Sequence, residues 1–204
     1  MKTFSFYGIA YFILLAIVLG LLYAFPKEEL HLLMNSYHTP IEDTFFKYYS
    51  TMAEWPLYVL ALLPVLWRRI QLTLLFAASV FEHNGQVLLP LVPGVDMYHG
   101  NSFPSGHAST FFVFFTCCTL LLAYHYRRKP NLLTTSKRWL IRLTMLVLLV
   151  MAALGAYSRV YLSQHFMLDV CVGSIIGFVT PCLMFFFAWD RIYKLSERFY
   201  RQRS

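Results

Sequence analysis

Long apolar runs separated by short polar segments make up most of this chain of 204 residues. The runs lie at about Phe4–Phe25, Met52–Trp67, Ile70–Phe81, Ala108–Tyr126, Trp139–Tyr157 and Phe166–Trp189. Because a helix needs about 20 apolar residues to cross a bilayer, the pattern predicts an all-α integral membrane bundle of six transmembrane helices. The third run is shorter than this length, so its helix is expected to extend into the following loop.

The segment between the first two runs, residues 26–50, is amphipathic. Thr39, Pro40 and Glu42 have the spacing of a helix start, with a capping threonine, a proline in the first turn and a glutamate that completes a capping box. Apolar side chains then recur every four positions, at Ile41, Phe45 and Tyr49. This stripe favours either an interfacial helix close to the functional face or a helix that packs on the bundle.

The composition supports a membrane protein with a single domain, residues 1–204. Hydrophobic residues make up 58% of the chain and charged residues only 13%, whereas soluble domains carry about 25% charged residues. The net charge of +7 does not indicate nucleic-acid binding, because that needs a basic, solvated face. Here the basic residues lie between apolar runs and in a basic, cytoplasmic tail at residues 190–204.

Small residues within the runs indicate packing. All four cysteines lie inside apolar runs and are interpreted as small buried hydrophobic residues, with no disulfide or metal site expected. Gly173 and Gly177 are four positions apart in the last run. This spacing predicts a seam at which two helices approach closely.

The distribution of basic residues predicts the orientation. Cytoplasmic loops of membrane proteins are enriched in lysine and arginine. If both termini are cytoplasmic, only three of the 17 basic residues lie outside: Lys27, Lys47 and Arg159. We therefore expect both termini in the cytoplasm.

Two polar clusters interrupt the apolar pattern. Ionisable residues beside membrane spans are costly unless they have a partner or a function. One cluster is Pro104-Ser105-Gly106-His107, and the other is Ser158-Arg159 followed by His165 and Asp169. With six spans, both clusters lie on the outer face, although about fifty residues separate them.

The second cluster has the parts of a nucleophilic site for phosphate. His165 and Asp169 are four apart at the expected start of the last helix, so they are predicted to share one face. The carboxylate would fix the tautomer of His165 and leave its other nitrogen as a nucleophile. The guanidinium of Arg159 suits bidentate binding of phosphate oxygens, and Ser158 offers a hydroxyl contact.

The first cluster complements the second. The backbone N–H groups of Ser105, Gly106 and His107 are expected to point out of a helix start, which favours an anion. The Ser105 hydroxyl is expected to donate to a phosphate oxygen. His107 is a candidate general acid for the departing alkoxide. A metal site is not expected, because Arg159 would repel a bound cation.

These two clusters resemble the second and third signature motifs of the type 2 phosphatidic acid phosphatase family, whose members are related to vanadium-dependent haloperoxidases. The resemblance implies that His165 is the nucleophile that forms a phosphohistidine, that Asp169 orients it and that His107 is the leaving-group acid. It also implies phosphate binding by Arg159, Ser105 and the Gly106 N–H, with no cofactor and no metal.

The first motif of that family, Lys-x6-Arg-Pro, is degenerate here. In the best register its three positions hold Ala78, Gly85 and Gln86. The nearby polar residues that remain as candidates to compensate are His83, Asn84 and His99. The loss of two cations is expected to weaken the capture of a phosphate dianion.

The sequence and the resemblance thus predict a metal-independent lipid phosphatase in a bacterial inner membrane, with its site facing the periplasm; an endomembrane with a lumenal site stays open as an alternative. Its partners are the bilayer and a lipid phosphate. Undecaprenyl pyrophosphate, phosphatidylglycerol phosphate, phosphatidic acid and a lipid A phosphate all remain open as substrates. Two alternatives also stay open. One is a pseudo-phosphatase that binds a lipid phosphate or a partner, and the other is a lipid phosphotransferase that uses the same histidine.

Overall fold

The computed structural model describes residues 2–66, 73, 76, 103–129 and 133–201 of the chain. The described part is helical, which confirms the predicted all-α class. Its elements in chain order are α1 (Lys2–Ala24), α2 (Lys27–Met34), α3 (Pro40–Ser50), the short 3-10 helix η1 (Thr51–Ala53), α4 (Pro56–Leu66), α6 (Gly106–Arg127), α7 (Thr135–Tyr161) and α8 (Met167–Arg201).

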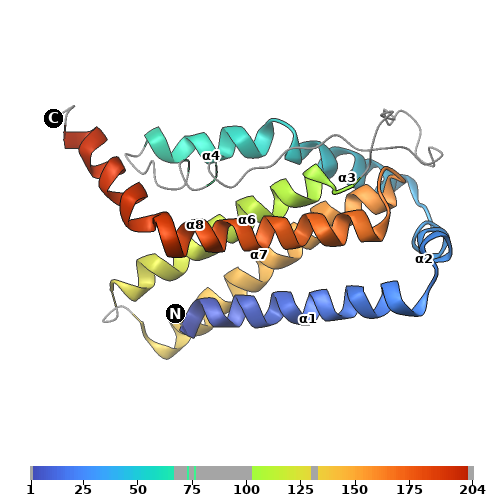
Figure 1. The fold of residues 1–204 in the computed structure, drawn as a ribbon, viewed down its shortest axis with the longest axis horizontal. Coiled ribbons are helices and arrows are strands. Elements are labelled where there is room, and N and C mark those ends of the chain that lie inside the picture. The colour runs from blue at the N-terminus through green and yellow to red at the C-terminus, as the bar shows by residue number, and fades with distance from the viewer. Residues whose placement is uncertain (1, 67–72, 74–75, 77–102, 130–132, 202–204) are drawn as a thin grey trace.

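Helices α6, α7 and α8 form the centre of the bundle (Figure 1). Helix α1 runs along one side of this group and α4 along the other, while α2 lies at the end of α1. The aromatic side chains of Tyr11 and Phe178 stack between α1 and α8, with ring centroids 4.0 Å apart. The Tyr7 hydroxyl lies 3.1 Å from the Thr116 hydroxyl of α6, so a buried hydrogen bond also attaches α1 to the centre.

Four of the described helices are long and apolar enough to span a membrane. These are Phe4–Ala24, Gly106–Arg127, Thr135–Tyr161 and Met167–Leu195, which match the first, fourth, fifth and sixth predicted spans. Helix α4 has only 11 residues and starts at Pro56 rather than near Met52, because residues 51–53 form the separate 3-10 turn η1. The third predicted span lies outside the described residues apart from Thr73 and Phe76. The second and third spans therefore stay predictions.

The predicted glycine seam is confirmed where α8 meets α6. A Cβ atom at Gly173 would lie 2.5 Å from the Ser105 carbonyl oxygen, and one at Gly177 would lie 2.5 Å from the Ser109 carbonyl oxygen. Any larger side chain would force the two helices apart. The four cysteines lie in the same two helices as free thiols.

The predicted cap of α3 is confirmed, and Phe45 and Tyr49 of the predicted apolar stripe lie on one face, with ring centroids 5.4 Å apart. The Thr39 hydroxyl accepts a hydrogen bond from the Glu42 N–H at 3.2 Å and donates to the Glu42 carboxylate at 2.7 Å. The buried residues of α3 are Phe46 and Ser50, whereas Ile41 is 82% exposed. Phe46 and Ser50 are also four positions apart, and they form the face of α3 that contacts α7.

Polar contacts fasten α3 to α7. The Tyr161 hydroxyl donates to the Asp43 carboxylate at 2.7 Å, and His38 Nδ1 lies 2.8 Å from the same oxygen. Desolvation acts to raise the pKa of Asp43, but these two hydrogen bonds outweigh it and hold that pKa below its ordinary value. The Tyr49 hydroxyl donates to the Met151 carbonyl at 2.9 Å. Helix α3 is therefore a packing helix, and its place at a membrane interface stays a prediction.

Candidate active site

The first polar cluster forms the N-terminus of α6. Ser105 is the N-cap, and its hydroxyl oxygen accepts from the Ala108 N–H at 3.4 Å. Ser105 and Gly106 are buried, while the His107 side chain keeps 18% of its surface exposed. The backbone N–H of Ser105 donates to the Asp169 carbonyl oxygen at 3.1 Å. It is therefore not available to an anion, which corrects one part of the predicted binding site and leaves the N–H groups of Gly106 and His107.

The second cluster begins at the last turn of α7. Arg159 is only 5% exposed, and its Nη1 donates to the Ser50 hydroxyl oxygen at 2.7 Å. The Ser158 hydroxyl donates to the Gly155 carbonyl at 2.6 Å. Because a hydroxyl has one proton to donate, Ser158 gives it to its own helix, and its predicted contact with phosphate receives no support.

A tight turn between α7 and α8 carries His165. The backbone N–H groups of Gln164 and His165 both donate to the Arg159 carbonyl oxygen, at 3.0 and 3.1 Å. Ser163 adopts the left-handed backbone region with a φ of 57°. Since α8 begins at Met167, His165 precedes the helix instead of lying within it. The sequence predicts His165 at the start of this helix, because the last apolar run begins at the next residue, Phe166.

Asp169 lies in the first turn of α8, beside His165. Its Oδ2 atom accepts from the Phe166 N–H at 3.2 Å, so the carboxylate caps its own helix. The same oxygen lies 3.8 Å from His165 Nδ1. This distance is an ion-pair contact that is longer than a hydrogen bond. Both side chains are buried, so the expected pair is brought together, with the carboxylate shared between ring and backbone.

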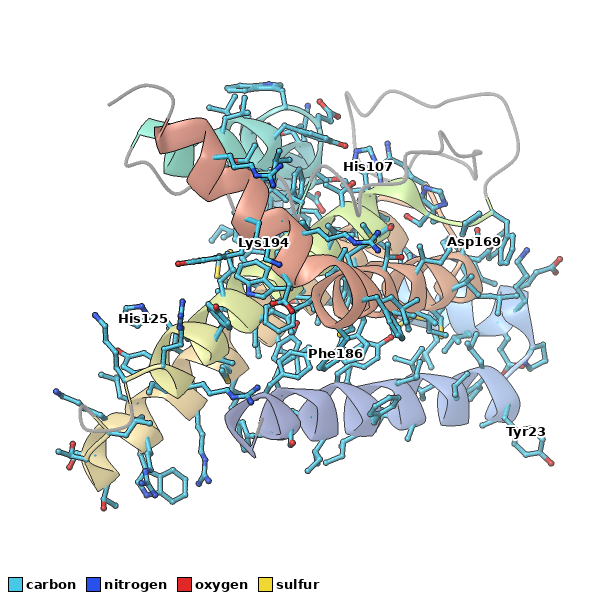
Figure 2. The ribbon with its side chains drawn as sticks, turned by 60° about the vertical axis from the view of Figure 1, so that its left-hand side comes forward. Tyr23, His107, His125, Asp169, Phe186 and Lys194 are labelled. Carbon is cyan, nitrogen blue, oxygen red and sulfur yellow. The ribbon has the colours of Figure 1, made fainter. Side chains whose placement is uncertain are left out.

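The structure joins the two clusters into one site. The hydrogen bond from Ser105 to the Asp169 carbonyl connects the start of α6 to the start of α8. His107 lies within electrostatic reach of Arg159 and His165. Figure 2 places His107 and Asp169 toward the same end of the bundle, away from His125 at the other end of α6. His165, His107 and Arg159 therefore converge, and residues of these types can supply the nucleophile, the acid and the cation that phosphoryl transfer needs.

Two residues of this site were missed by sequence reasoning. Ser50, the last residue of α3, is 2% exposed and accepts the hydrogen bond from Arg159. Glu54, which follows η1, has its Oε1 atom 3.8 Å from His107 Nε2. Both lie more than fifty residues before their partners, and neither belongs to a recognisable motif. Ser50 carries no signal in the sequence, whereas Glu54 is a charged residue inside the predicted apolar run Met52–Trp67 and could have been found by that anomaly.

Helix α2 supports the turn that carries His165. His31 Nε2 lies 2.8 Å from the Ser163 hydroxyl, and the Asn35 amide donates to the Val160 carbonyl at 3.1 Å. The Lys27 ammonium lies 3.7 Å from the centre of the Phe166 ring. The structure buries His31 against this turn. Burial, with the Lys27 charge in addition, lowers the pKa of His31.

We expect His31→Ala to lower the melting temperature of the purified protein. The change leaves the buried Ser163 hydroxyl without its partner, a loss of about 1–3 kcal/mol, or roughly 2–4 °C per kcal/mol for a chain of this size. Because folding lowers the pKa of His31, its contribution is present above the ordinary histidine pKa of about 6.5 and is lost as the pH falls through the folded value. Thermal unfolding at pH 7.5 and pH 5 should therefore show a smaller difference at pH 5.

The matched control for this experiment is His125→Ala, at an exposed position near the opposite end of α6. It should unfold at the wild-type temperature at both pH values. If His31→Ala and His125→Ala have the same melting temperature at pH 7.5, the contact between α2 and the turn contributes nothing to stability.

The degenerate first motif lies outside the described residues. This applies to Ala78, Gly85 and Gln86, and also to the candidates His83, Asn84 and His99. Whether any of these side chains reaches the site therefore stays a prediction.

Comparisons with known proteins cover both clusters. The model of the PAP2 superfamily matches residues 68–193, more than half of the chain. The solved structure of LpxE from Aquifex aeolicus is similar, with a TM-score of 0.52 and 23% sequence identity over 77% of this chain and 93% of that one. At this identity the likeness concerns the fold. No curated protein matches the chain.

Proposed function

Since the chain belongs to the PAP2 superfamily, we propose that it is a metal-independent lipid phosphatase that forms a covalent phosphohistidine. The observation that carries the proposal is the hydrogen bond between Ser105 and Asp169 at 3.1 Å. It connects the start of α6, where we propose that the phosphate binds, to the first turn of α8, next to the turn that holds His165. A phosphate that binds there meets a nucleophile and an acid together.

The first step is an attack by His165 on phosphorus. Its Nδ1 atom faces Asp169, so the carboxylate stabilises a proton on Nδ1 and leaves the lone pair of Nε2 for the attack. A bond forms between Nε2 and phosphorus as the bond from phosphorus to the leaving oxygen breaks. His107 transfers its proton to that oxygen, so that a neutral alcohol leaves, or a lipid monophosphate if the substrate is a diphosphate.

The second step hydrolyses the phosphohistidine. His107 is now neutral and accepts a proton from water as the water oxygen attacks phosphorus. The bond between phosphorus and Nε2 breaks, and inorganic phosphate leaves. His165 and His107 return to their starting protonation states, and Asp169 stabilises the charge on the His165 ring in both steps.

Arg159 and the start of α6 hold the phosphate group. The Arg159 guanidinium is fixed by Ser50 at 2.7 Å and neutralises the charge that builds up on the phosphate oxygens. The N–H groups of Gly106 and His107 point along the helix axis toward an anion at the N-terminus. The Ser105 hydroxyl, which accepts from Ala108, still has its proton to donate.

Orientation and substrate follow from the charge pattern and the membrane setting. The distribution of lysine and arginine favours cytoplasmic termini, which puts the site at the outer face of a bacterial inner membrane, toward the periplasm. The substrate is a membrane lipid with a terminal phosphate or diphosphate, because the site lies at the ends of apolar helices. Undecaprenyl pyrophosphate, phosphatidylglycerol phosphate, phosphatidic acid and a lipid A phosphate form the test panel.

The test is phosphate release by the purified protein, measured on this panel in detergent micelles with and without EDTA. We expect release from at least one lipid, at the same rate with the chelator. A rate that falls with EDTA and recovers with a divalent cation would contradict the metal-independent mechanism.

The degenerate first motif favours one alternative, a pseudo-phosphatase that binds a lipid phosphate without hydrolysing it. The same assay separates the two. A folded protein that binds the lipids but releases no phosphate would support the alternative. Radiolabelled phosphate that appears on a second lipid, rather than free in solution, would indicate a phosphotransferase.

A further inference from the structure

Glu54 lies between two short elements at the edge of the site. It follows η1 (Thr51–Ala53) and precedes the start of α4 at Pro56. Its side chain is 48% exposed, and its Oε1 atom lies 3.8 Å from His107 Nε2. Within the part of the chain that the structure describes, this is the carboxylate that faces the His107 ring.

The surroundings of the His107 ring disfavour its protonated form, which a neighbouring carboxylate would stabilise. The ring is mostly enclosed, and it lies within electrostatic reach of the Arg159 guanidinium and the His165 ring. Burial and a neighbouring positive charge both disfavour an imidazolium. Asp169, the other nearby carboxylate, is engaged with His165 and the Phe166 N–H. A general acid must nevertheless carry its proton when the substrate binds.

The segment that carries Glu54 is held in place by the site itself. Four residues before it, Ser50 accepts the hydrogen bond from Arg159 at 2.7 Å. One residue earlier, the Tyr49 hydroxyl donates to the Met151 carbonyl of α7 at 2.9 Å, and its ring stacks on Phe111 of α6 with centroids 5.3 Å apart. The position of Glu54 is therefore coupled to both helices that supply the site.

We propose that Glu54 is a positioning residue that holds the His107 ring and keeps it protonated for the departure of the lipid oxygen. This inference rests on the proposed phosphatase function and adds a residue outside the family's motifs. The carboxylate acts on the proton of His107 and does not touch phosphorus. Its effect should therefore depend on how much the leaving group needs an acid.

The test compares Glu54→Gln with the wild type on two substrates. The first is the phosphate monoester of the panel that the wild type hydrolyses fastest, because its alkoxide leaving group needs a proton. The second is p-nitrophenyl phosphate, whose acidic phenol leaves without one. General-acid catalysis is worth about 10²–10⁴ in rate, and loss of its charged partner should remove part of this. We expect kcat/KM, which reports formation of the phosphohistidine, to fall about tenfold on the lipid and to change less than about twofold on p-nitrophenyl phosphate.

The pH profile gives a second readout. The groups that face His107 are Glu54, which follows η1, Arg159 from α7 and His165 from the turn after α7. The Glu54→Gln change removes one negative charge from this set, so His107 should lose its proton at a lower pH. The alkaline limb of kcat on the lipid should shift toward lower pH, while the limb that reports His165 stays in place.

The matched control is Glu29→Gln, which removes an exposed carboxylate from α2 and should behave as the wild type. Equal losses on both substrates, or wild-type kinetics in Glu54→Gln, would overturn the role of Glu54 while leaving the phosphatase intact. A wild type that releases phosphate from neither substrate would overturn the phosphatase proposal and this inference with it.

Discussion

Replacement of His165 by alanine is expected to reduce phosphate release from the lipid substrate by about a thousandfold or more. Removal of a covalent nucleophile eliminates the pathway itself, so losses of this order or larger are usual. The measurement is single-turnover phosphate release on the best lipid of the panel. Labelled wild-type protein should also carry an acid-labile phosphoryl group that the variant lacks.

Because the His165 side chain is 2% exposed, the variant must be shown to fold. Its melting temperature should lie within a few degrees of the wild-type value, and His165→Gln, which fills more of the space, should be equally inactive. His125→Ala serves as the control for the loss of an exposed imidazole. A folded His165→Ala protein that keeps a tenth of the wild-type rate would show that another group attacks phosphorus.

The second large effect is expected from Gly173→Leu. A Cβ atom at this position would lie 2.5 Å from the Ser105 carbonyl oxygen, a backbone atom that cannot rotate away. Helix α8 must then move away from α6, which breaks the hydrogen bond between Ser105 and Asp169. Overpacking of this kind costs about 1–3 kcal/mol or more. We expect a fall of at least about 5 °C in the melting temperature, together with nearly complete loss of phosphate release.

Gly20→Leu is the matched control for Gly173→Leu. It also adds a leucine to an apolar helix, but a Cβ atom at Gly20 has no neighbour within 4 Å. Thermal unfolding and the phosphate assay should therefore give wild-type values for this variant. If Gly173→Leu has the same melting temperature and rate of phosphate release as Gly20→Leu, close contact between α6 and α8 is not what holds the two clusters together.

Local patterns predicted the helices best where a single helix has a long apolar run. The apolar stretch from Phe4 and the later three runs match helices that are long enough to span a membrane. The cap at Thr39 is also local, because a capping box joins residues three apart, and the structure confirms it. Between residues 51 and 66 the pattern was less informative, because a 3-10 turn and a proline divide one continuous apolar run.

The two polar clusters of the candidate site were predicted from the sequence, but the residues that hold them in place were not. Histidine, arginine and aspartate beside apolar runs are recognisable because such residues are costly there. Ser50 and His31 carry no such signal, since each lies in a polar connection where its residue type is ordinary. Glu54 is a charged residue inside the predicted apolar run Met52–Trp67, and this signal was not used. The importance of these three residues comes from contacts with residues 53 to 132 positions away in the chain.

The sequence by itself determined the helical class, the main apolar helices and the two polar clusters that form the candidate site. Residue type and helical period suffice for these, because both act within a few turns of the chain. Only the tertiary structure decided that His165 lies on a turn, that Ser105 bonds to Asp169 and that Glu54 faces His107. These features depend on how closely α6 and α8 approach and on where α3 packs, and side chains distant in sequence jointly set both.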